Sequence, residues 1–343
     1  MSAGILVANL GSPDAPSTEP VERYLCEFLM DPHVISLPSP LRSILVRRLI
    51  APRRAPNSAR AYRKIWMDHG SPLVVLSGRL ADALASATGL PVSLGMRYGS
   101  PSLRSALERL DDCDEVLVVP LYPHYALPTR QTLYEALDSL DGTGKVRVLR
   151  PFYDDPEFVE LLAGRIRDQL DESTDHLLFS FHGLPHRSIR LADPTKRHCL
   201  SRSSCCDDPS PAHEFCYRHQ CYATARAVAA TLNVAWSVSF QSRLGRLPWL
   251  TPYTDVRLRE LAERGARRVV VSSPSFMVDN LETLEELAIT GVERFKRYGG
   301  EELRVVPCLN AHARLVALLE RWLRNPSEWF EELTSVQSPR GCG

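Results

Sequence analysis

Short apolar runs and helical patterns alternate along the whole chain. Eight runs have the length and composition of buried strands: residues 5–10, 92–96, 116–121, 146–149, 177–181, 236–240, 269–271 and 305–306. Segments with helical periodicity lie between them, among them 72–88, 102–110, 156–170, 222–232 and 254–264. This alternation predicts an α/β protein with parallel sheets, in which four strands are followed by four more.

The two halves of the chain look like copies of one another. Pro123 and Pro274 are 151 residues apart, as are Thr132 and Thr283, and TLYE in the first half matches TLEE in the second. A length of 343 residues also exceeds what one hydrophobic core usually supports. We therefore expect a first domain at 1–150, a second at 151–333 with a cysteine-rich insert at 193–221, and a flexible tail at 334–343.

Charge and hydropathy narrow the class of protein. The 41 basic side chains balance 41 acidic ones, so no net field favours nucleic acid. No apolar run approaches the roughly 18 residues of a membrane span, and the start has no basic leader. We expect a cytoplasmic protein.

One stretch is nevertheless strongly basic. From Arg42 to Lys64 there are eight basic residues and no acidic one, and LRSILVRRLI at 41–50 fits an amphipathic helix with an apolar face. A solvated helix face is one interpretation. The other is a lip that binds an anionic ligand or lies on an anionic membrane surface.

Two segments that follow predicted strands carry groups for acid–base chemistry. His182, in FSFHGLP, stands at a strand end, where it could transfer protons, bind a metal or only pack in a turn. Asp279 and Glu282, in DNLETLEEL, have the spacing of a helix cap with its capping-box acid. Glu282 and Glu286 would share one helix face, where like charges repel unless a cation or a proton lies between them. Both interpretations of DNLETLEEL, helix cap and reactive pair, stay open on the pattern alone.

Two further loops offer groups for anion binding and stacking. The first half contributes Tyr122, His124, Tyr125 and Arg130, and the second half contributes Gln241, Ser242, Arg243 and Trp249. On pattern alone, a proline-stiffened surface loop explains the second set better than a binding site does.

Five of the nine cysteines gather in the insert with the spacing C-x5-C-C-x9-C-x4-C: Cys199, Cys205, Cys206, Cys216 and Cys221. In a reducing compartment such a group favours a thiolate-ligated metal centre over disulfides. The spacing is not that of a zinc ribbon, and zinc and [2Fe–2S] both remain open.

Together these motifs resemble the ferrochelatase family, the terminal enzymes of haem synthesis. The resemblance runs from GILVANLGSP through YLCEFLMDPHVI, YPHYALPT, FSFHGLP, LPWLTPYTD and DNLETLEE to LNAH. It implies two Rossmann-like, chelatase-like domains with parallel four-stranded sheets flanked by helices, and a porphyrin cleft between them. The first strand is not followed by G-x-G-x-x-G, which argues against an iron–sulfur nucleotide oxidoreductase.

The resemblance also implies roles for single residues. His182 matches the family's catalytic histidine and Glu282 its metal-associated glutamate, with Glu286 one turn further on and Fe²⁺ as the substrate metal. The expected porphyrin contacts are Leu10, Tyr122, Arg130, Gln241, Ser242 and Trp249, with the lip at 41–49. Leu10 stands where the coproporphyrin-using branch usually has Tyr, which favours protoporphyrin IX.

Some bacterial members of the family have an internal cysteine set for a [2Fe–2S] cluster. The resemblance therefore implies that four of the five clustered cysteines are ligands of such a cluster. The expected partners are protoporphyrin IX and Fe²⁺, with peripheral contact at the inner face of the membrane, and a homodimer is left open. The alternatives are a coproporphyrin ferrochelatase, a cobalt chelatase and a non-catalytic tetrapyrrole-binding protein.

Overall fold

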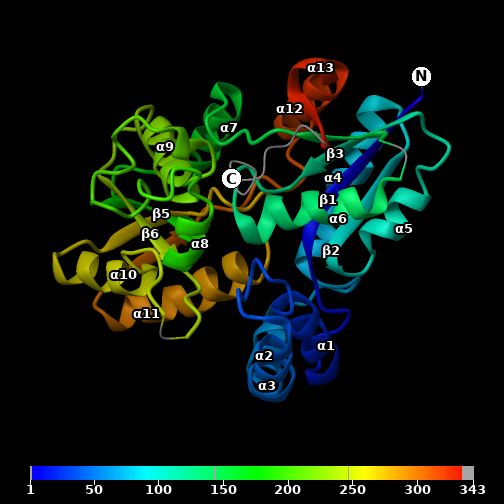
Figure 1. Ribbon diagram of the computed structural model, residues 1–343. Helices are drawn as coiled ribbons and strands as arrows, with labels where there is room; N and C mark the ends of the chain where they lie inside the picture. Colours follow the sequence, from blue (N-terminus) through cyan, green and yellow to red (C-terminus); the bar gives the residue numbers. More distant parts are fainter. Residues whose placement is uncertain (1, 143, 246, 334–343) are drawn as a thin grey trace. The chain divides into compact units, whose positions relative to one another are not determined.

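The computed structural model describes residues 2–142, 144–245 and 247–333, and these residues form two compact units (Figure 1). Within the described residues, the first unit holds 2–122, 127–150 and 310–333, and the second holds 123–126 and 151–309. The main division between the two units falls between Arg150 and Pro151. The second unit ends before residue 333, because the chain returns to the first unit at Asn310. The expected tail at 334–343, with Cys342, lies outside the described residues.

The first unit is built on a sheet with the strand order β2-β1-β3-β4-β9. Its strands are β1 (Ala3–Ser12), β2 (Val92–Gly99), β3 (Glu115–Pro120), β4 (Val146–Leu149) and β9 (Phe330–Glu332). Its helices are α1 (Thr18–Leu29), α2 (Ser39–Ile44), η1 (Leu45–Ile50), α3 (Ala51–Ile65), α4 (Pro72–Thr88), α5 (Leu103–Glu108), η2 (Leu127–Gln131), α6 (Thr132–Leu140), α12 (Ala313–Arg324) and α13 (Pro326–Trp329). The predicted four parallel strands are confirmed, and the antiparallel strand β9, which the pattern did not predict, covers the edge of β4.

The second unit contains a parallel sheet with the strand order β6-β5-β7-β8. Its strands are β5 (His176–His182), β6 (Trp236–Gln241), β7 (Arg268–Ser272) and β8 (Glu302–Val305). Its helices are α7 (Pro156–Arg167), α8 (His186–Leu191), η3 (Pro211–Glu214), α9 (Tyr217–Ala229), α10 (Thr254–Glu263), η4 (Glu282–Gly291) and α11 (Val292–Arg297). In Figure 1, α9 lies on one face of this sheet and α10 and α11 lie on the other. The predicted α/β fold with parallel sheets is therefore present in both units.

The four parallel strands of each unit have the same spatial order. Numbered along the chain within each unit, both sheets read second, first, third, fourth. A helix with π-type hydrogen bonds follows the third strand in each case, η2 after β3 and η4 after β7. This agreement supports the duplication expected from the repeated TLYE and TLEE segments.

Apolar runs from the strands form the core of each unit. In β1 the residues from Ile5 to Ala8 are completely buried, because parallel neighbours pair with both edges of the strand and helices cover its faces. In the second unit, β5 and β7 pack against α10, η4 and α11 through a cluster of Leu178, Leu258, Leu261, Val269, Val271, Leu287, Phe295 and Leu303.

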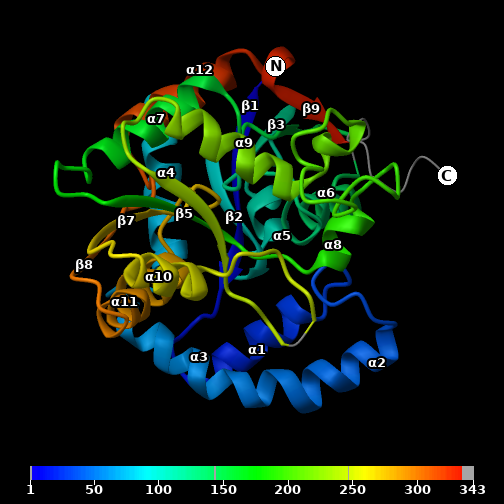
Figure 2. The same cartoon turned by 90° about the vertical axis from the view of Figure 1, so that its left-hand side faces the viewer.

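The basic stretch folds as one long helix composed of α2, η1 and α3 (Figure 2). Val46 is fully buried, whereas Leu41, Ile44 and Leu49 are 59%, 64% and 42% exposed. The predicted amphipathic helix is confirmed, and much of its apolar surface stays exposed in this unit. None of the described helices is long and apolar enough to cross a membrane.

Candidate functional site

His182 is the last residue of β5, at the topological switch point of the second sheet, where the order of the strands reverses. The chain runs from β5 to β6 on one side, and β7 pairs with the other side of β5. Loops that leave neighbouring strands on opposite sides separate at such a switch point, and ligands of doubly wound proteins bind there. The partly buried imidazole of His182 therefore lies at the kind of sheet edge where doubly wound proteins bind ligands.

One hydrogen bond fixes the tautomer of the His182 ring. Nδ1 of His182 lies 2.7 Å from the carbonyl oxygen of Gly183. A carbonyl can only accept, so Nδ1 carries the proton and Nε2 of the neutral ring carries the lone pair. His182 is thus a base that can accept a proton at Nε2. Its backbone N–H donates to Ser275 Oγ at 3.4 Å, which connects it to the loop after β7.

Gly183 allows a close approach that a side chain would prevent. A Cβ at this position would lie 2.7 Å from the Gln241 carbonyl oxygen and 3.3 Å from the Trp249 ring. The N–H of Gly183 donates to that same carbonyl at 2.8 Å. The glycine therefore lets the turn behind His182 lie directly against β6 and Trp249.

Asn280 and Thr283 hydrogen-bond to each other at the start of η4. The N–H groups of Glu282 and Thr283 donate to Asn280 Oδ1, and the Asn280 N–H donates back to Thr283 Oγ1. Asp279 instead accepts from the Thr283 hydroxyl and from the Cys308 N–H. Asn280 and Thr283 thus form a reciprocal pair of hydrogen bonds at this helix start.

Gln241 and Ser242 connect the end of β6 to η4. Gln241 pairs with His182 in the sheet, accepts from the Ser180 hydroxyl at 2.6 Å, and donates to the Glu282 carbonyl at 3.4 Å. Both carboxylate oxygens of Glu286 accept from Ser242, one from its N–H and one from its hydroxyl. Ser242 adopts a positive φ of 65°, and this conformation aims its N–H and hydroxyl at Glu286. The two glutamates and the histidine thus belong to one connected group of contacts.

Trp249 packs behind this group. The residue is 8% exposed, and its indole N–H has no hydrogen-bond partner among the described residues. The loop that carries it is held to the turn after β5 by a bridge between Pro185 and Trp249 and by the hydrogen bond from the Leu250 N–H to the Leu184 carbonyl. Arg243 from the same loop lies over the Tyr253 ring at 4.7 Å.

The other predicted porphyrin contacts belong to the first unit. Leu10 is partly buried near the end of β1. Tyr122 follows β3, and its buried hydroxyl has no hydrogen-bond partner among the described residues. Arg130 is completely buried, and its guanidinium donates to the carbonyls of Tyr122, Leu149 and Arg150. These bonds support the loop after β3 and leave the Arg130 guanidinium poorly placed for a substrate carboxylate. The position of Arg130 in the sequence did not suggest this supporting role.

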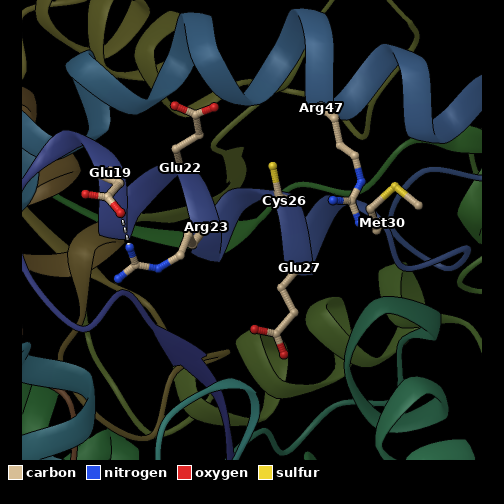
Figure 3. Close-up of a pocket in the computed structure, with 7 residues that line it drawn as sticks. All are labelled: Glu19, Glu22, Arg23, Cys26, Glu27, Met30 and Arg47. Atoms are coloured by element: carbon tan, nitrogen blue, oxygen red, sulfur yellow. Dashed lines mark hydrogen bonds and ion pairs between the residues drawn. The ribbon is translucent and has the colours of Figure 1, made fainter.

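A cavity of about 620 Å³ lies beside the lip helix within the first unit (Figure 3). It is lined by Glu19, Glu22, Arg23, Cys26, Glu27, Met30 and Arg47. Figure 3 shows Arg47 reaching from η1 toward Met30, while Glu22 and Cys26 point from α1 toward the lip helix. Its mixed charges and two sulfur groups define no single ligand.

The five clustered cysteines are buried, and none of them is in a disulfide. Cys216 hydrogen-bonds with both Cys199 and Cys206, and Cys206 with Cys205. The bond with Cys199 raises the pKa of Cys216 to about 12, and the bond with Cys216 raises the pKa of Cys206. Cys221 differs, since it hydrogen-bonds with the Tyr217 hydroxyl and burial raises its pKa.

Histidines hold the loop of Cys205 and Cys206 from three directions. Nε2 of His198 and Nε2 of His213 lie 2.6 and 3.0 Å from the Cys205 carbonyl oxygen, and Nδ1 of His219 lies 2.8 Å from that of Cys206. The His213 and His219 rings stack at 3.6 Å. The histidines thus act on the backbone of the cysteine loop.

As arranged, no group of three or more His, Cys, Asp or Glu side chains in the described part of the chain encloses a metal ion. The donor chemistry of the insert nevertheless fits a thiolate-bound metal, because four buried thiols contact one another in a row from Cys199 to Cys205. Metal binding would replace the sulfur–sulfur hydrogen bonds of this row.

Sequence reasoning missed several residues of the site. Asn280 and Ser275 are polar residues in loops, and their hydrogen bonds depend on how β7 is placed beside β5. Tyr217 joins the cysteine insert to the site, because its hydroxyl hydrogen-bonds with Cys221 and Ser275. Only the N-x-x-T spacing at Asn280 could have been found in the sequence, as an alternative cap.

The family model and the sequence relatives agree on one family. A model of the family described as ferrochelatase matches residues 2–326. The ferrochelatase of Opitutus terrae is 44% identical over 93% of this chain and 96% of its own length, and that of Azotobacter vinelandii is 46% identical over 94% and 98%. Among solved structures, SirB from Bacillus subtilis with Fe³⁺ has a TM-score of 0.52 at 12% identity, covering 96% of this chain and 98% of its own, which shows a shared fold. By this extent of similarity over almost its whole length, the chain belongs to the ferrochelatase family.

Proposed function

We propose that the chain inserts Fe²⁺ into protoporphyrin IX and so makes protohaem in haem biosynthesis. Membership of the family supports this reaction. The structural observation that carries it is the position of Gln241, which pairs with His182 in the sheet and hydrogen-bonds to the Glu282 backbone. The backbone of Glu282 therefore lies beside the strand end that carries His182, which supports a shared site for the two residues.

The reaction requires groups that take up protons and bind a cation. Metallation of the ring releases the two pyrrole N–H protons and forms bonds from the nitrogens to iron. Nε2 of His182 is the proposed acceptor of a pyrrole proton, since Nδ1–H is engaged with the Gly183 carbonyl. A distorted macrocycle would expose its nitrogen lone pairs, and rigid walls such as the buried Trp249 are suited to distorting it.

The two glutamates have different proposed roles. Glu286 is held by two hydrogen bonds from Ser242, at 3.0 and 2.6 Å, so its carboxylate has a fixed position. Glu282 begins η4, and its backbone carbonyl accepts from Gln241, the residue that pairs with His182. We assign Glu282 to Fe²⁺ binding and Glu286 to positioning the end of β6 and passing protons onward.

The porphyrin contacts proposed for each unit follow from burial and chemistry. Leu10 and Tyr122 in the first unit, and Gln241, Ser242 and Trp249 in the second, supply apolar surface and hydrogen-bonding groups. Leu10 in place of a tyrosine favours protoporphyrin over coproporphyrin, whose two extra carboxylates call for polar partners. Arg130 is left out of the proposed set because its donors bind backbone carbonyls.

We assign the cysteine centre to a [2Fe–2S] cluster with Cys199, Cys205, Cys206 and Cys216 as its ligands. These four thiols form the continuous row, whereas Cys221 is bonded to Tyr217. Thiolates are the ligands of such clusters, which supply electron-transfer or sensing chemistry when bound. A structural zinc site on the same residues is the alternative.

Substrate choice separates this function from its rivals. Initial rates with Fe²⁺, Co²⁺ and Zn²⁺ are measured against protoporphyrin IX and coproporphyrin III. We expect kcat/KM to be highest for Fe²⁺ with protoporphyrin IX. Faster turnover of coproporphyrin, preference for Co²⁺, or binding of porphyrin without any metallation would each replace the proposal by the corresponding alternative.

Substitution of the two reactive groups tests the mechanism. His182→Ala removes the proton acceptor and Glu282→Gln removes the charge that binds Fe²⁺. Each should lower kcat by about 100-fold or more in Fe²⁺ insertion. The free energy of unfolding in urea should change far less than kcat, because both side chains are only partly buried and neither belongs to the apolar core.

Two matched variants serve as controls for these substitutions. His176→Asn changes the histidine at the other end of β5, which contacts Ser237, and should leave kcat unchanged. Asn280→Ala removes the cap of η4 and should cost about 1 kcal/mol of stability. If Glu282→Gln has normal kcat and loses as much stability as Asn280→Ala, Glu282 has a structural role and not a catalytic one.

The cysteine assignment predicts which thiol is dispensable. Anaerobically purified protein should be red-brown and hold about two iron and two sulfide per chain. Cys216→Ser should lose the colour and the iron, because Cys216 stands in the middle of the row. Cys221→Ser should keep both. Equal loss in the two variants would overturn this choice of ligands, and a colourless protein with one bound zinc would replace the cluster.

The exposed apolar residues and arginines of the lip helix support peripheral membrane contact. Arg47→Glu with Arg48→Glu should weaken co-sedimentation with anionic phosphatidylglycerol vesicles, most strongly at low salt. Arg79→Glu with Arg104→Glu, on α4 and α5, makes the same change in charge away from the lip and should have little effect. Equal effects of both pairs would show that only net charge matters.

A further inference from the structure

Arg218 directs its charge at the sulfur atoms of the cysteine insert. It is the second residue of α9, and its Nη1 lies 3.0 Å from Cys206 Sγ and 3.6 Å from Cys205 Sγ. Another donor from outside the row is the Leu200 N–H, which lies 3.4 Å from Cys205 Sγ. Arg218 therefore brings a full positive charge to the middle of the row of thiols.

The charge of Arg218 has no carboxylate partner among the described residues. The side chain is partly buried, and its guanidinium stacks over the Tyr222 ring at 5.1 Å. A guanidinium stays protonated in proteins, and a neutral thiol is a weak acceptor for it. The partner that best suits this position is a negatively charged sulfur.

Arg226 lies eight residues, or about two turns, after Arg218 in α9, and it contacts a carboxylate in place of sulfur. It lies over the same Tyr222 ring at 5.7 Å, but it is exposed and pairs with Asp207. The two arginines thus share an aromatic neighbour and differ in what their N–H groups contact. This difference separates packing on Tyr222 from an effect on the cysteines.

We propose that Arg218 is a positioning residue of the cysteine centre. Arg218 holds Cys205 and Cys206 in place as ligands, and its positive charge offsets the negative charge of the bound [2Fe–2S] cluster. The proposal rests on the cluster assigned to these cysteines. A cluster with four thiolate ligands is an anion and becomes more negative on reduction, so a nearby N–H donor and positive charge favour the reduced form. Arg218 accordingly raises the reduction potential of the cluster and slows its loss.

The test uses the full chain purified without oxygen. The midpoint potential is measured by dye-mediated titration followed in the visible spectrum, and iron release is followed with a ferrous chelator under reducing conditions. Arg218→Gln should shift the potential to a more negative value and release iron roughly 10-fold faster. Arg218→Lys keeps the charge but loses the planar fork, so its potential should lie between those of Arg218→Gln and the unchanged protein.

Arg226→Gln is the matched control, and its potential and iron release should equal those of the unchanged protein. The same shift in Arg218→Gln and Arg226→Gln would overturn the proposal in favour of packing on Tyr222, and so would an unshifted potential in Arg218→Gln. If Arg218→Gln assembles no cluster, the test rests on Arg218→Lys. A midpoint potential of Arg218→Lys equal to that of the unchanged protein would then overturn the proposal. If the unchanged protein contains no iron and no sulfide, both the cluster assignment and this role of Arg218 are wrong. Fe²⁺ insertion by the same protein would still support the proposed enzymatic function.

Discussion

Parallel pairing of β5 with β6 and β7 is the constraint on which the candidate site depends. It aligns His182 with Gln241 at the ends of their strands and brings the loop after β7 to the His182 backbone. Gly183 makes the pairing close enough, because any side chain there would meet the Gln241 carbonyl. The tautomer of His182 and the position of the Glu282 backbone both depend on contacts at these strand ends.

Hydrogen bonds turn this alignment into a chemically specific site. The Gly183 carbonyl leaves the His182 lone pair on Nε2, and Ser242 fixes Glu286 through both of its oxygens. Asn280 and Thr283 hold the start of η4 through a reciprocal pair of hydrogen bonds.

The cysteine insert is connected to this site through ordinary contacts. Tyr217 begins α9 directly after Cys216, and its hydroxyl hydrogen-bonds with Cys221 and with Ser275, which in turn accepts from the His182 N–H. The insert itself is held by histidines on its backbone and by Arg218 on its sulfurs. Polar side chains thus order a segment that has little apolar material of its own.

The sequence by itself determined the α/β class, the parallel strands, the amphipathic lip helix and the candidates His182, Glu282 and the five cysteines, because periodicity and residue chemistry are local properties. Only the tertiary structure decided that β9 covers β4, that Asn280 caps η4, that Arg130 is buried on carbonyls, and that Cys221 stands apart from the row of thiols. Each of these depends on groups that lie far apart in the chain or compete for the same donor. Local pattern can name such groups, but their partners are set by packing in three dimensions.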